Sequence, residues 1–186
     1  MTDLYKNKYR IGTTRLKNWD YSSTGAYFIT ICTKNYEHYF GEITDREMIL
    51  SEIGKIVSDE WKKTPAIRSD MNIEIDEFVI MPNHFHGIII IGENKYNNLG
   101  NDCRDAMPRV SMPCIPMCKI TPQSKNLASI IRGFKSSVTL FARKQGIPFV
   151  WQPRFYEHII RNEESLCEIR NYIFNNPLNW EKDKEN

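Results

Sequence analysis

Two histidines that lie one residue apart are the first sign of chemistry in this chain. The stretch MPNHFHGIII, from Met81 to Ile90, contains two of the four histidines among 186 residues. On a strand, His84 and His86 project from one face while Phe85 points to the other. Two imidazoles on one strand can hold a divalent ion, although such a pair can equally be satisfied by hydrogen bonds. The spacing makes both histidines candidate metal ligands.

A second group of reactive side chains lies near the end of the sequence, in CEIRNYIFNNPLNW. Tyr172 and Asn176 are four residues apart, so on a helix both emerge on one face. Asn176 offers an amide oxygen as a third metal ligand beside the phenol of Tyr172. That phenol, with a pKa of about 10, is a poor nucleophile until a base or a cation lowers the value. Tyr172 is therefore a candidate nucleophile, and the alternative is a half-buried helix aromatic.

The first half of the chain predicts the elements that position the histidines. The β-branched and aromatic residues of Ala26–Thr33 predict a strand, and a short hairpin around Asp45 follows. Ser51 is placed to cap a helix that Pro65 ends. Asn72–Ile80 and the stretch HFHGIIIIG then read as two strands joined by a tight turn.

The second half predicts the elements that carry the tyrosine. Residues 93–122 have scattered Asn, Gly and Pro and no usable period, which predicts a long mobile loop. A basic amphipathic helix follows, capped by Ser124 and closed by Gly146. The stretch PFVWQPRFYEHII predicts a strand with an edge or bulge at Pro153. A last helix runs from the cap Asn162 to about residue 175 and stops before Pro177.

Apart from the small hairpin, the order is strand, helix, strand, strand, helix, strand, followed by one more helix. This order predicts an α+β, ferredoxin-like split βαβ sandwich with an additional C-terminal helix. In that arrangement both helices of the core cover one face of the sheet, and the strand with His84 and His86 is central. The last helix and the histidines are expected to meet on the other face.

Positive charge is concentrated in two segments, although the net charge is only +2. Residues 1–17 carry five Lys or Arg against one Asp, and residues 125–161 carry seven against one Glu. With nearby aromatics, such segments favour binding to a phosphate backbone and to exposed bases, and two solvated basic faces are the alternative. Tyr156 and His158 share one face of their strand. The candidate nucleic-acid contacts are Arg10, Arg15, Lys125, Arg132, Lys135, Arg154, Tyr156 and His158.

Composition predicts a single domain spanning residues 1–186, with 41% hydrophobic residues to fill its core. The chain shows no apolar signal segment and no apolar run long enough for a membrane helix, so we expect a cytoplasmic, nucleoid-associated protein. An odd number of cysteines without a CxxC argues against a disulfide framework. They are Cys32, Cys103, Cys114, Cys118 and Cys167.

Taken together, four runs carry a resemblance to a known family: WDYSSTGAYFITICT, DEFVIMPNHFHGIIII, IIRGFKSS and WQPRFYEHIIRNEESLCEIRNYIFNNPLNW. They resemble the REP-associated tyrosine transposases, relatives of the single-tyrosine HUH transposases of small insertion sequences. The resemblance implies that His84 and His86 bind Mg²⁺ or Mn²⁺ and that Tyr172 attacks single-stranded DNA. The insertion-sequence relatives usually have glutamine where this chain has Asn176, which is one methylene shorter.

The resemblance implies a metal-dependent single-stranded DNA endonuclease and strand transferase that acts through a covalent 5′-phosphotyrosine. Its expected partners are single-stranded or hairpin DNA, including REP-like palindromes, and a second copy of the chain with exchanged C-terminal helices. The alternative function is a module of the same fold that binds hairpin DNA or RNA without cutting it. The target sequence does not follow from the residues.

Overall fold

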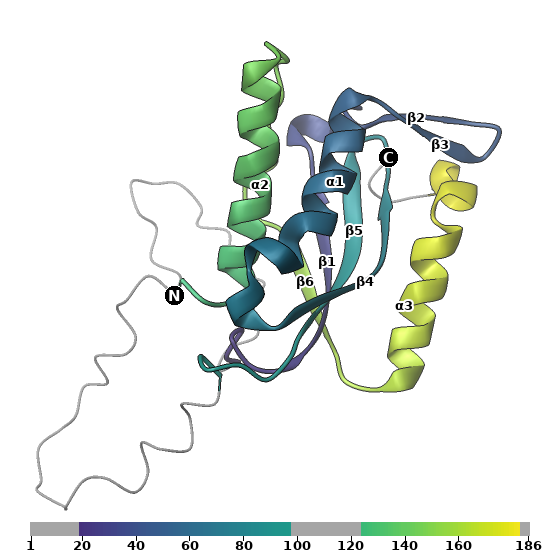
Figure 1. Cartoon of the computed structure of the whole chain (residues 1–186). Helices are drawn as coiled ribbons and strands as arrows, with labels where there is room; N and C mark the ends of the chain where they lie inside the picture. Colours follow the sequence, from purple (N-terminus) through teal and green to yellow (C-terminus); the bar gives the residue numbers. More distant parts are fainter. Residues whose placement is uncertain (1–18, 98–123, 183–186) are drawn as a thin grey trace, which may run out of the picture.

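The computed structural model describes residues 19–97 and 124–182 of the chain (Figure 1). The expected loop at 93–122 therefore lies mostly outside the described residues, as do Arg10 and Arg15.

A four-stranded antiparallel sheet with the order β4-β5-β1-β6 forms the centre of the fold (Figure 1). Its strands are β1 (Gly25–Cys32), β4 (Ile73–Ile80), β5 (His84–Ile91) and β6 (Tyr156–Ile160). Strands β2 (Gly41–Thr44) and β3 (Glu47–Leu50) pair separately as the expected small hairpin. The β5 strand with both histidines is central, which confirms the predicted split βαβ arrangement.

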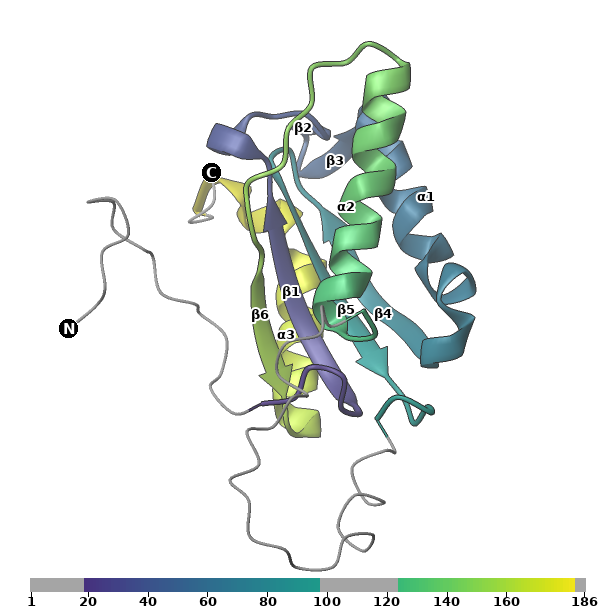
Figure 2. The ribbon, with the colours of Figure 1, turned by 90° about the vertical axis from the view of Figure 1, so that its left-hand side faces the viewer.

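Three helices cover the two faces of the sheet (Figure 2). Helices α1 (Glu52–Ile67) and α2 (Leu127–Lys144) lie on one face, and α3 (Glu163–Asn175) lies on the other. Short 3-10 segments are η1 (Lys34–Tyr36), η2 (Ser69–Met71) and η5 (Pro177–Lys182). Within residues 19–97 and 124–182, no helix combines the length and the apolar character that crossing a membrane requires.

Alternation along the strands divides the buried side chains into two cores. On the α1 and α2 face, Trp61 packs its ring against Phe85 and Phe134 at centroid distances of 4.9 and 5.2 Å. On the α3 face, a smaller core contains Phe28, Ile88, Ile160, Leu166 and Ile173. Burial of each large apolar side chain contributes about 1.5–3 kcal/mol to stability. This burial holds the helices against both faces of the sheet. The α3 face is the one that carries His84 and His86.

Three predicted boundaries were wrong. Helix α1 continues through Pro65 to Ile67, because a proline in the last turn removes only one helix hydrogen bond. The cap of α2 is Asn126 and not Ser124, because Asn126 and Ser129 form a reciprocal capping box. The final strand is shorter than predicted, because it consists of β6 alone, with an isolated bridge at Trp151 before it. Between them, Arg154 adopts a φ of 72°, which interrupts the strand pairing.

Candidate active site

Strand pairing places the two histidines in the middle of the α3 face. In the register of β1 and β5, Cys32 lies opposite His84 and Thr30 lies opposite His86. The two imidazole rings lie 4.5 Å apart between centroids. Both side chains are buried, with exposed fractions of 0% for His84 and 3% for His86. The rings are therefore held side by side and are shielded from solvent.

Hydrogen bonds fix the orientation of each ring. Asn83 Oδ1 lies 2.7 Å from His84 Nδ1, and Thr30 Oγ1 lies 2.8 Å from His86 Nδ1. An amide oxygen only accepts, so His84 donates from Nδ1 and keeps its lone pair on Nε2. Such partners behind a histidine set the tautomer that a metal ligand requires.

Burial also keeps the second histidine uncharged. Desolvation lowers the pKa of His86 well below its ordinary value of 6.5, and the neighbouring His84 lowers it further. The neutral imidazole is the form that binds a metal ion.

Helix α3 brings Tyr172 to the histidines. The Tyr172 hydroxyl lies 3.1 Å from His86 Nε2, and the two ring centroids are 5.2 Å apart. The ring also meets Phe28 edge-on at 6.1 Å. With 45% of its surface exposed, Tyr172 is reachable from solvent while its hydroxyl faces the site. The phenol and His86 therefore meet on the α3 face, as the sequence predicted.

Asn176 ends helix α3, and its side-chain amide is buried. It is the C-cap residue of α3 and is 3% exposed. Its Oδ1 has no hydrogen-bond partner among the described residues. A buried acceptor left unsatisfied costs about 1–3 kcal/mol, so the position is one that a ligand would stabilise.

The donor set suits a divalent cation. The amide oxygen is a ligand that suits Mg²⁺ or Mn²⁺, and the two imidazole nitrogens are ligands that divalent transition metals accept. In the described ranges no group of three or more His, Cys, Asp or Glu side chains is arranged to hold a metal ion. Asn176 is the candidate third protein ligand for a site built on His84 and His86.

The η5 segment covers one side of this site. The Trp180 ring stacks on His84 at 6.1 Å, with 30° between the ring planes, and meets His38 edge-on at 5.6 Å. Trp180 therefore shields the His84 ring from solvent.

Two candidate DNA contacts lie at the edge of the same face. Tyr156 pairs with Thr30 and His158 pairs with Phe28 across β1 and β6, so both project beside the histidine site. Both are exposed on an edge strand, where a nucleic acid can reach them.

Three basic candidates gather elsewhere, in an open groove of ≈ 570 Å³ between α2 and the segment before β6. Helix α2 lies on the face opposite the histidines, so this groove is separate from the candidate active site. Its polar and charged lining residues are Arg132, Lys135, Ser136, Thr139, Arg143 and Arg154.

Lys135 and Lys125 are engaged by the protein itself. The Lys135 ammonium donates to the carbonyl oxygens of Gln152 at 2.7 Å and Arg154 at 2.9 Å, and burial lowers its pKa to about 8. Lys135 therefore fastens the segment that leads to β6. Lys125 pairs with Asp70 at 2.5 Å, in the network described next.

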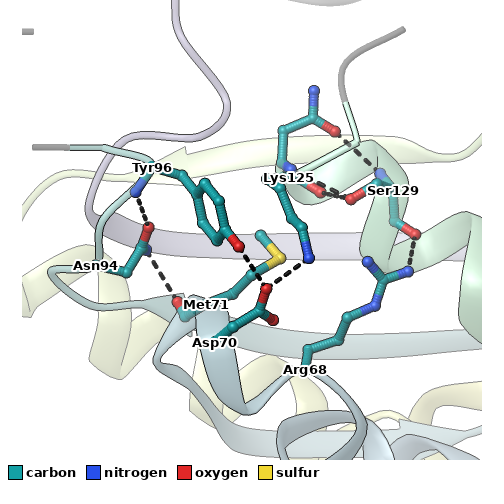
Figure 3. A network of polar contacts seen from close by, with 8 residues as sticks. Arg68, Asp70, Met71, Asn94, Tyr96, Lys125 and Ser129 are labelled. Carbon is teal, nitrogen blue, oxygen red and sulfur yellow. Dashed lines mark hydrogen bonds and ion pairs between the residues drawn. The ribbon is translucent and has the colours of Figure 1, made fainter. Parts of the chain in front are cut away.

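A polar network joins the chain on either side of residues 98–123 (Figure 3). Asp70 accepts hydrogen bonds from Tyr96 at 2.7 Å and from Lys125 at 2.5 Å. These two donors hold the pKa of Asp70 at about 2, well below its ordinary value of 3.8. Asp70 thus joins Tyr96 and Lys125, which lie on either side of residues 98–123, to η2.

Sequence reasoning missed Thr30, Asn83 and the ion pair between Asp76 and Arg170. Asn83 follows Pro82 in a tight turn, and its position next to His84 was the one available signal. The strand register that places Thr30 opposite His86 cannot be read from the sequence, because the pairing of β1 with β5 depends on the packing of the whole sheet.

The chain is similar to known proteins in sequence and in fold. No protein-family model matches the chain. An uncharacterized protein of Haemophilus influenzae is 43% identical over 174 residues, or 91% of this chain and 89% of that protein. The REP-associated tyrosine transposase of Escherichia coli is 27% identical over 112 residues, or 60% of this chain and 48% of that protein.

A solved structure shows the same fold. The structure of a REP-associated tyrosine transposase bound to a REP hairpin aligns with a TM-score of 0.55 and 20% identity, covering 92% of this chain and 77% of that chain. The chain is thus similar in sequence to one REP-associated tyrosine transposase and shares the fold of another.

Proposed function

We propose that this chain is a metal-dependent single-stranded DNA endonuclease and strand transferase that forms a covalent 5′-phosphotyrosine at Tyr172. The observation that carries the proposal is the contact of 3.1 Å between the Tyr172 hydroxyl and His86 Nε2. The contact places the phenol oxygen beside the atom through which His86 would bind a metal ion, and a bound ion there could activate the phenol as a nucleophile.

The proposed reaction exchanges one phosphodiester for another. The Tyr172 oxygen attacks the scissile phosphorus and loses its proton, while the bond from phosphorus to the 3′ oxygen breaks and that oxygen gains a proton. The products are a 5′-phosphotyrosine and a free 3′-hydroxyl. Because the new linkage is still a phosphate diester, a second 3′-hydroxyl can reverse the step without ATP.

His84, His86 and Asn176 would hold Mg²⁺ or Mn²⁺ through the two Nε2 atoms and Oδ1. When bound, the ion supplies positive charge that stabilises the charge developing on the phosphate oxygens. The three protein ligands are neutral, so they leave that charge almost uncompensated. Thr30 and Asn83 keep both imidazoles oriented for this role.

The proposed substrate is single-stranded DNA flanked by a hairpin. The relative of known structure is bound to a REP hairpin, and this chain offers a basic groove for a phosphate backbone. Tyr156 and His158 are exposed beside the histidines, where they are able to stack on or bond to unpaired bases. Strand β6 lies at the sheet edge, so DNA can pass along it toward Tyr172.

A cleavage assay tests the proposal. Single-stranded oligonucleotides flanked by hairpins are incubated with the full chain with and without Mn²⁺, and the products are separated under denaturing conditions. The expected result is a protein-linked DNA species that appears only with the metal. Tight binding with no covalent species on any hairpin substrate would overturn the proposal and favour the non-cleaving binding module.

A further inference from the structure

Helix α3 rests on the sheet through a narrow apolar stripe. Leu166, Ile169 and Ile173 pack against the small core around Phe28 and Ile88. Such contacts decide which side of the helix is buried, but they are not directional. Directional contacts on the flanks of α3 can therefore fix its rotation more closely than the apolar stripe does.

One flank is fixed by a forked ion pair. Arg170 Nε lies 3.1 and 3.2 Å from the two carboxylate oxygens of Asp76, and its terminal nitrogen donates to Oδ2 at 2.5 Å. A guanidinium that engages both oxygens of a carboxylate adds geometric specificity as well as attraction. This pair is the polar link that joins α3 to β4 across 94 positions of sequence.

An irregularity in β4 presents the carboxylate. The register of β4 against β5 shifts between Ile75 and Phe78, which places Asp76 and Glu77 in a bulge. Asp76 Oδ1 also accepts the Glu77 backbone N–H at 2.7 Å. The Asp76 side chain is mostly buried, and the hydrogen bonds from Arg170 lower its pKa, so the docked helix faces a charged carboxylate.

The other flank carries the nucleophile. At 100° per residue, Arg170 and Tyr172 lie about 160° apart around the helix, with the apolar stripe between them. Arg170 faces the edge strand β4, and Tyr172 faces His86 on β5. Turning α3 in either direction would lift one of these two side chains away from the sheet.

We infer that Arg170 and Asp76 are positioning residues that lock the rotation of α3 and thereby keep the Tyr172 hydroxyl facing the histidine site. The catalytic consequence rests on the proposed function, whereas the lock itself is a property of the fold. Misplacing a reacting atom by about 1 Å can cost on the order of 100-fold in rate.

The test compares Asp76→Asn, Arg170→Gln and the exchanged pair Asp76→Arg with Arg170→Asp. Glu74→Gln is the matched control, because Glu74 is exposed on the same strand. The rate of covalent adduct formation in a single turnover should fall about tenfold or more in each single variant, with the affinity for single-stranded DNA unchanged. The exchanged pair should recover part of the rate, which a general loss of stability would not do.

A second readout does not depend on activity. Imidazole NMR signals of His86 report its contact with the Tyr172 hydroxyl, and Tyr172→Phe defines the signal when that contact is absent. In Asp76→Asn and Arg170→Gln the His86 signal should move toward that of Tyr172→Phe, with circular dichroism confirming that α3 remains folded. If a variant loses α3, Arg170→Lys, which keeps the charge and loses the fork, replaces it.

The outcomes separate the two ideas. If the wild-type chain forms no adduct, the proposed function fails. The NMR signal of His86 then tests by itself whether Arg170 and Asp76 fix the rotation of α3. If the wild-type chain forms the adduct, wild-type adduct rates in folded single variants would overturn the lock. A His86 signal that does not move in those variants would overturn it in either case.

Discussion

The Tyr172 hydroxyl lies 3.1 Å from Nε2 of His86, while Thr30 holds the other ring nitrogen of that histidine at 2.8 Å. Both nitrogens of His86 are thereby engaged. If His86 is a metal ligand, the ion must use Nε2, and the phenol must leave that atom. The phenol and the ion therefore compete for one position.

The first prediction concerns Tyr172→Phe. Removing the hydroxyl should abolish the covalent species, while Mn²⁺ should bind as well as in the wild type or up to about tenfold more tightly, because one competing hydrogen bond is gone. Titration calorimetry with Mn²⁺ and denaturing gels measure the two effects. Tyr156 is the rival nucleophile, so a DNA remnant that maps by mass spectrometry to the peptide with Tyr156 would refute the assignment.

The second prediction concerns the histidines. His84→Ala or His86→Ala should eliminate metal-dependent cleavage and leave binding to single-stranded DNA largely intact, because basic side chains supply most of the backbone affinity. Parallel cleavage and fluorescence-anisotropy assays separate these effects. Full metal-dependent cleavage in both variants would contradict the proposed ligands.

The third prediction uses the unsatisfied oxygen of Asn176. Asn176→Leu removes a buried acceptor without a partner, so it should raise the stability of the metal-free protein by about 1 kcal/mol. The same change should weaken Mn²⁺ binding. Urea unfolding and calorimetry measure these opposite effects, and a residue that is only structural would not produce both. Unchanged Mn²⁺ affinity would remove Asn176 from the ligand set.

The fourth prediction concerns acid stability at Asp70. Its pKa is lowered on folding from 3.8 to about 2, so its contribution is present above about pH 4 and is lost as the pH falls toward 2. Near neutral pH, Asp70→Asn should therefore unfold at lower urea than the wild type, and the difference should shrink between about pH 4 and pH 2. Asp59→Asn, on the exposed surface of α1, is the control. A difference that does not depend on pH would contradict this role of Asp70.

The fifth prediction concerns the basic groove. Arg132→Ala should weaken hairpin DNA binding and reduce the slope of log affinity against log salt by about 0.7–0.9, the value for one lost phosphate contact. Lys63→Ala is the control, since Lys63 pairs with Glu60 on α1. An unchanged salt slope in Arg132→Ala would exclude the groove as a backbone contact. Single strands flanked by a hairpin should also bind more tightly than the matching duplex at equal salt.

The sequence by itself determined the features that depend on near neighbours. Alternation along His84, Phe85 and His86 puts the imidazoles on one face, because successive strand residues point in opposite directions. The cap at Asn162 and the stop before Pro177 bound the last helix for equally local reasons. The order of these elements was enough to predict the sheet topology.

Only the tertiary structure decided which distant groups meet. The register of β1 and β5 sets Thr30 behind His86, and the docking of α3 brings Arg170 to Asp76 and buries the Asn176 oxygen. The same long-range packing pairs Lys125 with Asp70 and Lys135 with backbone carbonyls. The sequence had predicted both lysines as DNA contacts. Charge and periodicity specify what a side chain is able to bind, but its partner depends on contacts between segments far apart in the chain.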